Sequence, residues 1–388
     1  MQQTASATEE LDISIVMPCL NEAEGVAECV RKGREWIDRA GLKGEVVVVD
    51  NNSTDDSAEL AAAAGARVIA ERDPGYGSAL RAGFRQARGR FMVMGDCDGT
   101  YDFSQLDALV GPLDEGYDLV MGNRLTDQLA PGAMPWAHRF IGTPMISWIL
   151  RIFTGAKIRD SQCGLRAMRR DSIQALGLRS TGMEFASEMI LRAMRRGLKI
   201  TQVPISYDVR AGESKLSTFR DGWRHLRFLL ISSPSHAFLL PGLLFMLLGL
   251  FSLIITVSTN SGLDIGDLNW EPVFAASIFF VVGINVVMLG VLAKLLAFRT
   301  SGIESRVVDF YHRYLGLERL LLVSGAGFLA GGIIDLVVLI EWLGGTAAYP
   351  DLLPWAAVGQ ALIVIGANVL FGAIAAAMVD HDIGPEHP

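Results

Sequence analysis

Cysteine is scarce in this sequence, and its four cysteines are not arranged for metal binding. Cys19, Cys29, Cys97 and Cys163 form no CxxC pair and have no histidine cluster nearby. This spacing predicts neither a zinc site nor a disulfide framework, so reduced thiols are expected. Basic residues are outnumbered as well, with 34 Lys and Arg against 42 Asp and Glu, and the net charge of -8 argues against nonspecific nucleic-acid binding.

A signal-peptide pattern is also missing. The first residues, MQQTASATEELDIS, contain no basic run followed by an apolar core, so the front half is expected to stay in the cytosol. Apolar residues, in contrast, are in excess at 51% of the chain, and they gather in long uncharged stretches after about residue 233. The composition therefore predicts a water-soluble front half followed by a membrane-embedded back half.

The back half contains four apolar segments that each reach the roughly 20 residues needed to cross the hydrocarbon core. These segments are 236–258, 272–298, 319–343 and 353–379. The turns at 259–271 and 344–352 contain no Lys or Arg, whereas the turn between the second and third segments contains Arg299, Arg306, Arg313 and Arg319. The positive-inside rule then predicts a protein of the plasma (inner) membrane, with its front half and both termini in the cytosol.

An amphipathic helix is predicted just before the first span. Its apolar residues recur at helical spacing beside a stripe of arginines at Arg220, Arg224 and Arg227. Such a helix can lie at the membrane surface and contact lipids, or it can pack on the soluble domain. The expected organisation is a tail at 1–10, a catalytic domain at 11–215, the interfacial helix at 216–233, a four-helix membrane domain at 234–380 and a tail at 381–388.

The front half alternates apolar β-branched runs with helical patterns. The expected strands are 13–18, 45–50, 66–71 and 90–96. This alternation predicts an α/β fold with a mainly parallel sheet and helices on both faces, and ligands of such sheets bind at the carboxyl ends of the strands. Asp50 could accept hydrogen bonds from a base or ribose there, with Glu22 reaching the ribose. Alternatively, the run after Asp50 only caps the next helix, which Asn52, Ser53 and Asp55 suffice to do.

Asp96 ends the fourth run and Asp98 follows it in "FMVMGDCDGTYDF". Residues i and i+2 of an extended chain face the same way, so both carboxylates could bind Mg²⁺ or Mn²⁺. Two other interpretations of this stretch are a plain Asp-Gly turn and the first motif of haloacid dehalogenase-like phosphatases. No later strand ends in the paired aspartates those phosphatases use, and no Glu completes an EF-hand loop. A metal site that binds a diphosphate is favoured.

With these segments placed, residues 11 to 233 resemble the family 2 glycosyltransferases, specifically the polyprenyl-phosphate (dolichyl-phosphate mannose synthase-like) glycosyl synthases. The resemblance rests on motifs in order, including VMPCLNEAEGV, VVVVDNNSTDDS, GYGSALRAGF, VMGDCDGTYDFSQL, LVMGNRL, DSQCGLRAMRR and RAGESKLS. It implies a GT-A fold and an inverting enzyme that uses Mg²⁺ or Mn²⁺. The implied reaction moves a sugar from a nucleotide sugar, of the GDP-mannose or UDP-glucose type, to a polyprenyl or dolichyl phosphate.

The same resemblance implies roles for residues at matching positions. The catalytic set would be Asp96, Asp98, Arg124, Arg139, Arg210 and Lys215, whose basic members would surround the diphosphate and the acceptor phosphate. The nucleotide-sugar contacts would be Pro18, Asn21, Glu22, Asp50, Gly77, Arg81, Asp96, Cys97 and Asp98. The sugar pocket would be shaped by Asp160, Arg166, Glu184 and Glu188. The chain departs from the family at Thr100, where many members carry a further oxygen ligand, so water or Asp102 would complete the metal shell.

Two other functions remain open from the sequence. A family 2 polysaccharide or glycolipid synthase would carry a Gln-x-x-Arg-Trp motif at the interfacial helix, and "WRHLRF" does not supply it. A catalytically inactive membrane partner could bind a nucleotide sugar, although the intact Asp-x-Asp and the basic residues argue against it. The oligomeric state is not fixed, and a homo-oligomer is one option.

Overall fold

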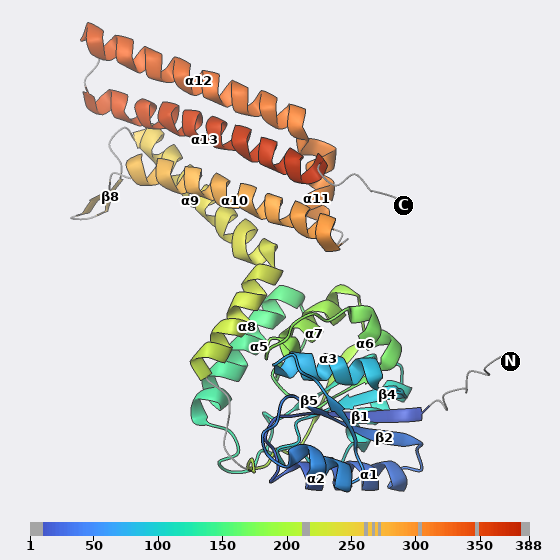
Figure 1. Ribbon diagram of the computed structural model, residues 1–388. Helices are drawn as coiled ribbons and strands as arrows, with labels where there is room; N and C mark the ends of the chain where they lie inside the picture. The colour runs from blue at the N-terminus through green and yellow to red at the C-terminus, as the bar shows by residue number, and fades with distance from the viewer. Residues whose placement is uncertain are drawn as a thin grey trace, which may run out of the picture. The chain divides into compact units, whose positions relative to one another are not determined.

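The computed structural model describes residues 11–211, 218–259, 263–265, 268–270, 273–301, 305–345 and 349–381 (Figure 1). Internal contacts divide the chain into two compact units, Met1–Leu229 and Leu230–Pro388. The first unit holds the mixed strands and helices, and the second holds the long apolar helices.

Among the described residues of the first unit, seven strands form one sheet in the order β3-β2-β1-β4-β6-β5-β7. β6 is antiparallel to both of its neighbours, and the other neighbouring strands are parallel. The predicted mainly parallel α/β fold is therefore confirmed. The strands are β1 (Leu11–Cys19), β2 (Gly44–Asp50), β3 (Arg67–Ala70), β4 (Gly89–Met94), β5 (Leu119–Asn123), β6 (Arg166–Arg169) and β7 (Ile200–Pro204). The last three were not predicted.

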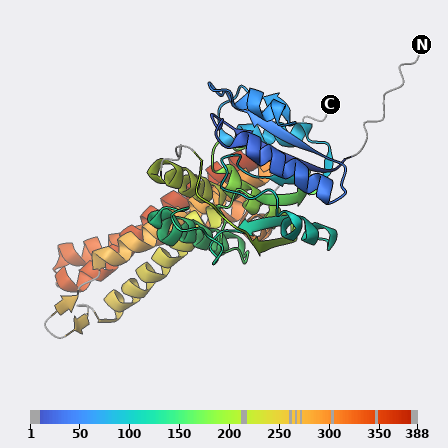
Figure 2. The same ribbon diagram turned by 90° about the horizontal axis from the view of Figure 1, so that it is seen from below.

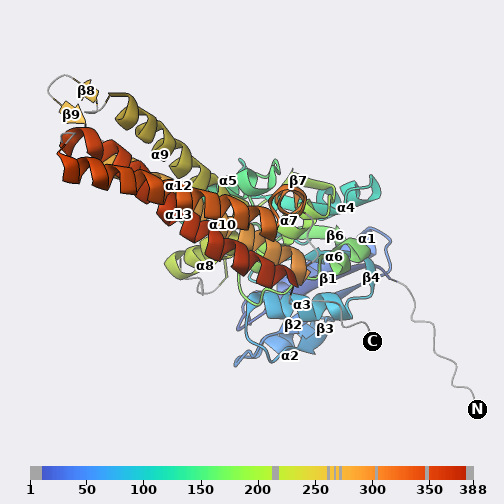
Figure 3. The ribbon, with the colours of Figure 1, turned by 90° about the horizontal axis from the view of Figure 1, so that it is seen from above.

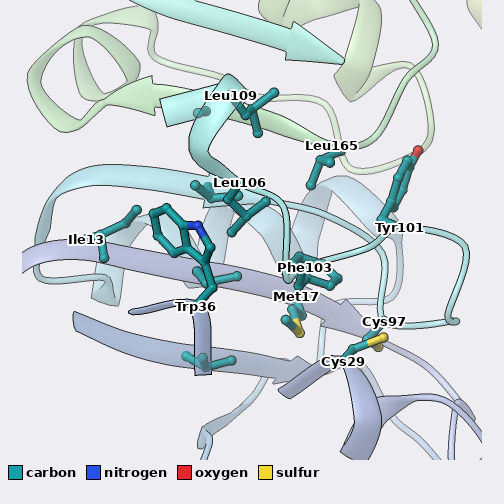
Figure 4. Packing of buried hydrophobic residues seen from close by; sticks show 14 of the residues in the cluster. Ile13, Met17, Cys29, Trp36, Cys97, Tyr101, Phe103, Leu106, Leu109 and Leu165 are labelled. Carbon is teal, nitrogen blue, oxygen red and sulfur yellow. The ribbon is translucent and has the colours of Figure 1, made fainter. Parts of the chain in front are cut away.

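Helices cover both faces of the sheet, and each face buries its own apolar cluster. Ile15 packs with α1, α2 and α4 on one face, while the next residue, Val16, packs with α3, α5, α6 and α7 on the other. This alternation is the period of two that a strand requires. Figure 4 shows the first cluster, with Trp36 lying near Ile13 and Leu106. The helices are α1 (Val26–Arg39), α2 (Ser57–Ala63), α3 (Tyr76–Gln86), α4 (Asp107–Asp114), α5 (Thr143–Thr154), α6 (Arg170–Leu176) and α7 (Phe185–Arg195).

In the described part of the second unit, four helices are long and apolar enough to cross a membrane, as predicted. α10 packs on α9 and α13, and α12 packs on α13 (Figure 3). α9 and α10 can approach closely because Gly249 and Gly283 have no Cβ. A Cβ at Gly249 would collide with the backbone of Phe280, and a Cβ at Gly283 would collide with that of Met246. The helices are α9 (Leu240–Thr259), α10 (Val273–Ser301), α12 (Leu317–Gly344) and α13 (Tyr349–His381).

Short elements join these helices. A small hairpin of β8 (Leu263–Ile265) and β9 (Leu268–Trp270), which was not predicted, lies between α9 and α10 (Figure 2). α11 (Arg306–Phe310) and the π-helix η3 (Tyr311–Leu315) connect α10 to α12. The π-helix η2 (Ser235–Leu239) precedes α9. The apolar segments found in the sequence therefore correspond to continuous helices with short connections.

Glu45 ties together the ends at which four neighbouring strands begin. Its carboxylate accepts hydrogen bonds from Ser14 Oγ at 3.0 Å, Arg67 Nε at 2.8 Å, and both the backbone N and Nη2 of Arg88 at 2.9 Å. Burial acts to raise the pKa of Glu45, but the hydrogen bonds from Arg67 and Arg88 outweigh it and lower the pKa to about 2. The ionised carboxylate thus holds the strand register at this edge.

Replacing Glu45 with Gln is expected to lower the free energy of unfolding by about 2 kcal/mol at pH 7, because an amide cannot accept from both arginines. The folded pKa of about 2 lies below the usual value, so the carboxylate stabilises the fold above that usual value. This contribution is lost as the pH falls toward 2. Thermal unfolding of the purified full chain at several pH values measures the effect.

The matched control is Glu115→Gln, since Glu115 is exposed at the end of α4. The stability difference between Glu45→Gln and the parent should shrink steadily below about pH 4, near the usual glutamate pKa. A difference that stays constant down to acid pH would contradict the proposed ionic role of Glu45.

Candidate active site

A cavity of about 1280 Å³ opens at the carboxyl ends of β1, β2, β4 and β5, where the fold class predicts a ligand. Part of its lining is charged and includes Glu22, Asp96, Asp98, Arg124 and Arg210. The rest is largely apolar and comes from α5, from α8 (Thr218–Ser232), from the segment before α5, and from α7 with the residues just before it. Its members include Met134, Ile141, Met145, Ile146, Ile149, Met183, Leu226 and Leu229. One cavity therefore combines a charged lining with an apolar lining.

The two aspartates lie on a bend instead of an extended strand. β4 ends at Met94, and Gly99 has a φ of +82°, a conformation that glycine adopts without strain. The expectation that an extended backbone would direct both carboxylates is therefore wrong in its geometry. Both residues nevertheless line the same cavity, and the charge of Asp98 acts on the ionisation of Asp96.

Asp96 is enclosed by two tyrosines and a glycine. The Tyr76 hydroxyl at the start of α3 hydrogen-bonds the Asp96 carboxylate, and the Tyr101 hydroxyl accepts from Gly164 N at 2.8 Å. A Cβ at Gly164 would lie 2.8 Å from Asp96 Oδ2 and 3.1 Å from Tyr101 Oη, so glycine alone fits without displacement. Among the described residues, Asp96 Oδ1 is buried without a hydrogen-bond partner. Burial, with the nearby charge of Asp98, raises the pKa of Asp96 to about 7.

Asp98 is fixed from two sides. Its Oδ1 accepts hydrogen bonds from Thr100 N at 3.1 Å and Thr100 Oγ1 at 2.6 Å, and its Oδ2 lies 3.1 Å from Arg210 Nη1. Arg210 also forms an ion pair with Glu22. The segment after β7 is fastened over the bend because Ala211 N donates to Asp98 O at 2.9 Å. A guanidinium is thus held between two carboxylates.

Arg124, at the end of β5, is oriented by a buried ion pair. Its Nε and Nη2 donate to Asp160 Oδ2 and Oδ1 at 2.8 and 3.0 Å, and its backbone N donates to Oδ2 at 3.1 Å. Burial acts to raise the pKa of Asp160, but Arg124 lowers it below the usual value. The Arg124 guanidinium also lies 5.1 Å from the centre of the Tyr207 ring. These contacts fix a cation in the cavity wall before any substrate enters.

The carboxylates fit a divalent cation. In the described part of the chain, the unpartnered Oδ1 of Asp96 belongs to a buried carboxylate whose charge Arg124 and Arg210 offset only in part, and oxygen ligands suit Mg²⁺ and Mn²⁺. No cluster of three or more His, Cys, Asp or Glu occurs in the described ranges, so water and substrate oxygens would complete the shell. The two other residues considered as metal ligands already have partners within the chain. The Thr100 hydroxyl donates to Asp98, and the Asp102 carboxylate accepts hydrogen bonds from the side chains of Ser104 and Gln105.

The expected nucleotide-sugar residues fall into two groups. Pro18, Glu22, Asp96, Cys97 and Asp98 line the cavity. The others have local contacts in the described part of the chain, which hold the loops around the cavity. Asn21 Oδ1 accepts from Thr54 N, Asp50 Oδ1 accepts from Ser53 N, Gly77 N donates to Thr181 O, and Arg81 donates to Arg179 O.

The expected sugar-pocket residues lie behind the cavity wall. Arg166 is fully buried and donates to the carbonyls of Cys163, Ala186 and Ser161. Glu184 accepts from Gly182 N, and Glu188 accepts from the backbone of Arg179 and Ser180. Asp160 holds Arg124. Their contacts position wall residues such as Gly182 and Ala186, which line the cavity.

The remaining expected residues lie nearer the edge of the site. Arg139 is exposed in the π-helix η1 (His138–Gly142), with its guanidinium 5.2 Å from the centre of the Phe140 ring. Lys215 lies outside the described residues. The helix expected at 216–233 corresponds to α8 (Thr218–Ser232), which is fastened to α7 by a 3.0 Å hydrogen bond between His225 Nδ1 and Ser187 Oγ. Trp223 on α8 is exposed, so the helix has a packed side and an open side.

Sequence reasoning missed the residues that orient the aspartates. Tyr76, Tyr101 and Gly164 surround Asp96, and Tyr207 packs against Tyr101 with ring centres 5.3 Å apart. Tyr76 lies in the motif GYGSALRAGF and Gly164 in DSQCGLRAMRR, so these motifs are the sequence feature that could have pointed to the two residues. Glycine has no functional side chain, and the tyrosine hydroxyl is uncharged near pH 7, so neither residue stands out as a site residue from the sequence alone.

Comparison with known proteins agrees with this geometry. Residues 14–177 match "Glycosyl transferase family 2", and residues 292–380 match "Glycosyltransferase family 2 C-terminal transmembrane region". The low-salt glycan biosynthesis hexosyltransferase Agl6 of Haloferax volcanii is 34% identical over 364 residues, covering 93% of this chain and 87% of that protein. The chain belongs to glycosyltransferase family 2.

Other similar proteins cover the catalytic unit of this family 2 glycosyltransferase. The dolichyl-phosphate hexose transferase of Haloferax volcanii is 34% identical over 213 residues, covering 54% of this chain and 89% of that protein. Glucosyl-3-phosphoglycerate synthase from Mycobacterium tuberculosis, solved with Mn²⁺, uridine diphosphate and glucosyl-3-phosphoglycerate, is 25% identical with a TM-score of 0.47. That match covers 57% of this chain and 80% of the other.

Membership in glycosyltransferase family 2 settles the general class. The chain is a glycosyltransferase with a GT-A-like, mainly parallel α/β unit, as the resemblance implied. Its match to the transmembrane region of the family, together with the four long apolar helices in the described residues, makes it an integral membrane protein.

Replacing Asp160 with Asn in this glycosyltransferase is expected to lower the free energy of unfolding by about 3 kcal/mol, because it leaves the Arg124 guanidinium buried without a counter-ion. Thermal unfolding of the purified full chain measures the loss. The double variant Arg124→Met with Asp160→Asn should recover much of the stability but no transfer activity. If Asp160→Asn unfolds at the parent temperature, the buried pair does not hold the site together.

Proposed function

We propose that this enzyme transfers a hexose from a nucleotide sugar, of the GDP-mannose or UDP-glucose type, to a polyprenyl or dolichyl phosphate. The main support is the single cavity in which Asp96, Asp98, Arg124 and Arg210 share a lining with the apolar side chains of α5 and α8. A nucleotide sugar needs the charged lining, and an isoprenoid chain needs the apolar one. The similarity to the dolichyl-phosphate hexose transferase of Haloferax volcanii supports the same acceptor.

In this proposal Asp96 and Asp98 would hold Mg²⁺ or Mn²⁺, which would bind the donor diphosphate. When bound, the ion offsets the negative charge that builds up on the leaving nucleoside diphosphate. Glu22 and Pro18 line the cavity near the end of β1, where the nucleoside would lie. Arg124 is already fixed by Asp160, and Arg210 can exchange a carboxylate for a phosphate oxygen because guanidinium binds both groups through paired N–H donors.

The reaction is an in-line displacement with inversion. A phosphate oxygen of the acceptor attacks the anomeric carbon, a new carbon–oxygen bond forms, and the bond from that carbon to the nucleoside diphosphate breaks. The acceptor is a phosphate monoester whose second pKa is about 6, so the attacking oxygen is already ionised near pH 7. No side chain has to remove a proton. The chain contributes positioning and electrostatic stabilisation through its fixed cations.

We further propose that the catalytic unit and both termini lie on the cytosolic side of the plasma (inner) membrane. Arg306 and Arg313 lie in α11 and η3, the elements that connect α10 to α12, and Arg299 and Arg319 lie at the facing ends of those helices. Basic residues near span ends favour the cytosolic side. The catalytic unit would then face the compartment in which nucleotide sugars are made.

Replacing Asp98 with Asn is expected to reduce the transfer of labelled sugar to polyprenyl phosphate by at least about a hundredfold. Losing one group that stabilises charge in the transition state typically lowers the rate by this factor. The substitution should also abolish the Mn²⁺-dependent rise in unfolding temperature, since a bound ion stabilises only the state that binds it. Transfer is measured by extracting labelled lipid, and its mass identifies the sugar.

The matched control is Asp114→Asn, whose carboxylate is exposed at the end of α4. It should retain both the transfer and the Mn²⁺-dependent shift. Full activity in EDTA together with full activity of Asp98→Asn would rule out the metal site. Transfer to water alone, with no labelled lipid from any polyprenyl phosphate, would rule out the proposed acceptor.

The orientation can be tested in intact cells with two variants that each add one cysteine to the four buried native ones. Tyr314→Cys lies in η3 between α10 and α12, and Asn269→Cys lies in the hairpin between α9 and α10. A membrane-impermeant maleimide should label Asn269→Cys directly and Tyr314→Cys only after the membrane is permeabilised. The reverse labelling order would place the catalytic unit outside the cytosol.

A further inference from the structure

Asp335 is a carboxylate inside an apolar helix of the membrane domain. α12 is 28 residues long, and Asp335 lies well before its last residue, Gly344. At 1.5 Å per residue, α12 is about 42 Å long and the Asp335 Cα lies about 14 Å from that end. The hydrocarbon core is roughly 30 Å thick, so Asp335 lies within it. Lysine and arginine near a span end can extend to the water, but an aspartate side chain is too short to do so from this depth.

The carboxylate of Asp335 lies at the seam between α12 and α13. A Cβ at Gly359 of α13 would collide with Asp335 Oδ1 and would lie 3.0 Å from its Cγ, so glycine is the residue that fits beside this acid. In the part of the chain that the structure describes, Asp335 has no hydrogen bond or ion pair. Acidic residues in membrane spans are costly without a partner, and they usually pair with an opposite charge. Asp335 is therefore a place where a partner is expected.

The side of α12 next to Asp335 is open. Phe328 and Leu339 lie seven residues before and four residues after Asp335, so they share its side of the helix, and both are exposed. Gly332, three residues before Asp335, has nothing within 4 Å of the position that a Cβ would take. Among the described long helices, α12 packs mainly on α13 (Figure 1). An open glycine between exposed apolar side chains lets the backbone of a further helix approach.

The charge of Asp335 indicates a cationic partner, and a second copy of this chain does not supply a cation at that depth. Lysine and arginine occur in the four described spans at Lys294, Arg299 and Arg319. All three lie within about 11 Å of the ends of α10 and α12 that α11 and η3 join, whereas Asp335 lies about 27 Å from that end of α12. A second copy has the same orientation in the membrane. A symmetric contact through α12 would also bring two carboxylates together.

We propose that Asp335 and the open side of α12 bind a transmembrane helix of another protein, which carries a lysine or arginine at the depth of Asp335. The two opposite charges would pair within the hydrocarbon core, and Gly332 would let the two helices approach closely. This contact is separate from the active-site cavity, whose described lining comes from residues up to Leu229. The proposal holds whichever sugar and acceptor the enzyme uses.

The contact is tested with synthetic transmembrane peptides of leucine and alanine that share the same charged flanks and differ at one position. The first peptide carries a lysine at the depth of Asp335, the second a leucine at that position, and the third a lysine two helical turns away. Each peptide carries an acceptor fluorophore. The full chain, in lipid vesicles, carries the donor at Asn269→Cys in the hairpin between α9 and α10. The four native cysteines are at most 2% exposed and should stay unlabelled.

Energy transfer should show that the parent chain binds the first peptide at least about tenfold more tightly than the other two, which corresponds to about 1.4 kcal/mol. Asp335→Asn should remove this preference, and Asp335→Glu should keep most of it. The matched control is Glu341→Gln, whose carboxylate is exposed near the end of α12, and it should bind like the parent. Sugar transfer should be unchanged in all three variants, because the described cavity lining contains no residue of α12.

Two results would overturn the proposal. Equal binding of the first and second peptides to the parent chain would show that Asp335 does not pair with a cation. Energy transfer between two labelled copies of the chain that depends on Asp335, without competition from the first peptide, would show that this side of α12 is a contact between copies. The comparison of peptides on the parent chain needs no variant, so it decides the question even if Asp335→Asn misfolds. Neither result affects the proposed transfer reaction, which is tested by the labelled lipid product.

Discussion

Glu22, Asp96 and Asp98 bring three carboxylates to the lining of one cavity, and this negative charge constrains the rest of the site. Burying an ion costs several kcal/mol unless an opposite charge or hydrogen bonds replace its water. Arg210 bridges Glu22 and Asp98, while one oxygen of Asp96 has no hydrogen-bond partner among the described residues and the pKa of Asp96 is raised. The chain's own arginines thus offset only part of the negative charge of the site. A bound diphosphate with a divalent cation would supply positive charge for Asp96 and phosphate oxygens for the arginines.

The same constraint explains the residues behind the wall. Arg124 can present a cation to the cavity because Asp160 holds it through three hydrogen bonds. Arg166, which has the same chemistry, donates instead to three backbone carbonyls and fixes the loop that carries Gly164. One arginine faces the cavity and the other supports the turn beside Asp96. The sequence around Arg124 and Arg166 does not show which of them faces the cavity, because the burial of each side chain depends on the antiparallel strand β6 and its neighbours.

The fold was predictable where the hydrophobic period was strong. β1 and β2 are β-branched runs followed by helices of regular period, and the four membrane helices are long uninterrupted apolar segments. β6 reads RAMR, with arginine at both ends, and its place in the sheet depends on pairing with β4 and β5. Whether these four residues form a strand is therefore decided by tertiary pairing and not by their own sequence pattern. The Asp-x-Asp spacing correctly indicated two acids in one cavity, but the bend at Gly99 and the tyrosine contacts depend on the folded backbone.

The apolar face of α5 shows a further limit of pattern reading. Apolar residues at helical spacing mean core in a soluble unit and lipid contact in a membrane-bound one, and the spacing is the same in both. Charge distribution separates the two cases, since residues 131–159 lack acids in an acidic chain. The proposed transfer from a water-soluble donor to a lipid needs a cavity with both a charged and an apolar lining. α5 contributes Ile146 and Ile149 to the apolar lining of the cavity, while the charged lining comes from residues that follow β4 and β5.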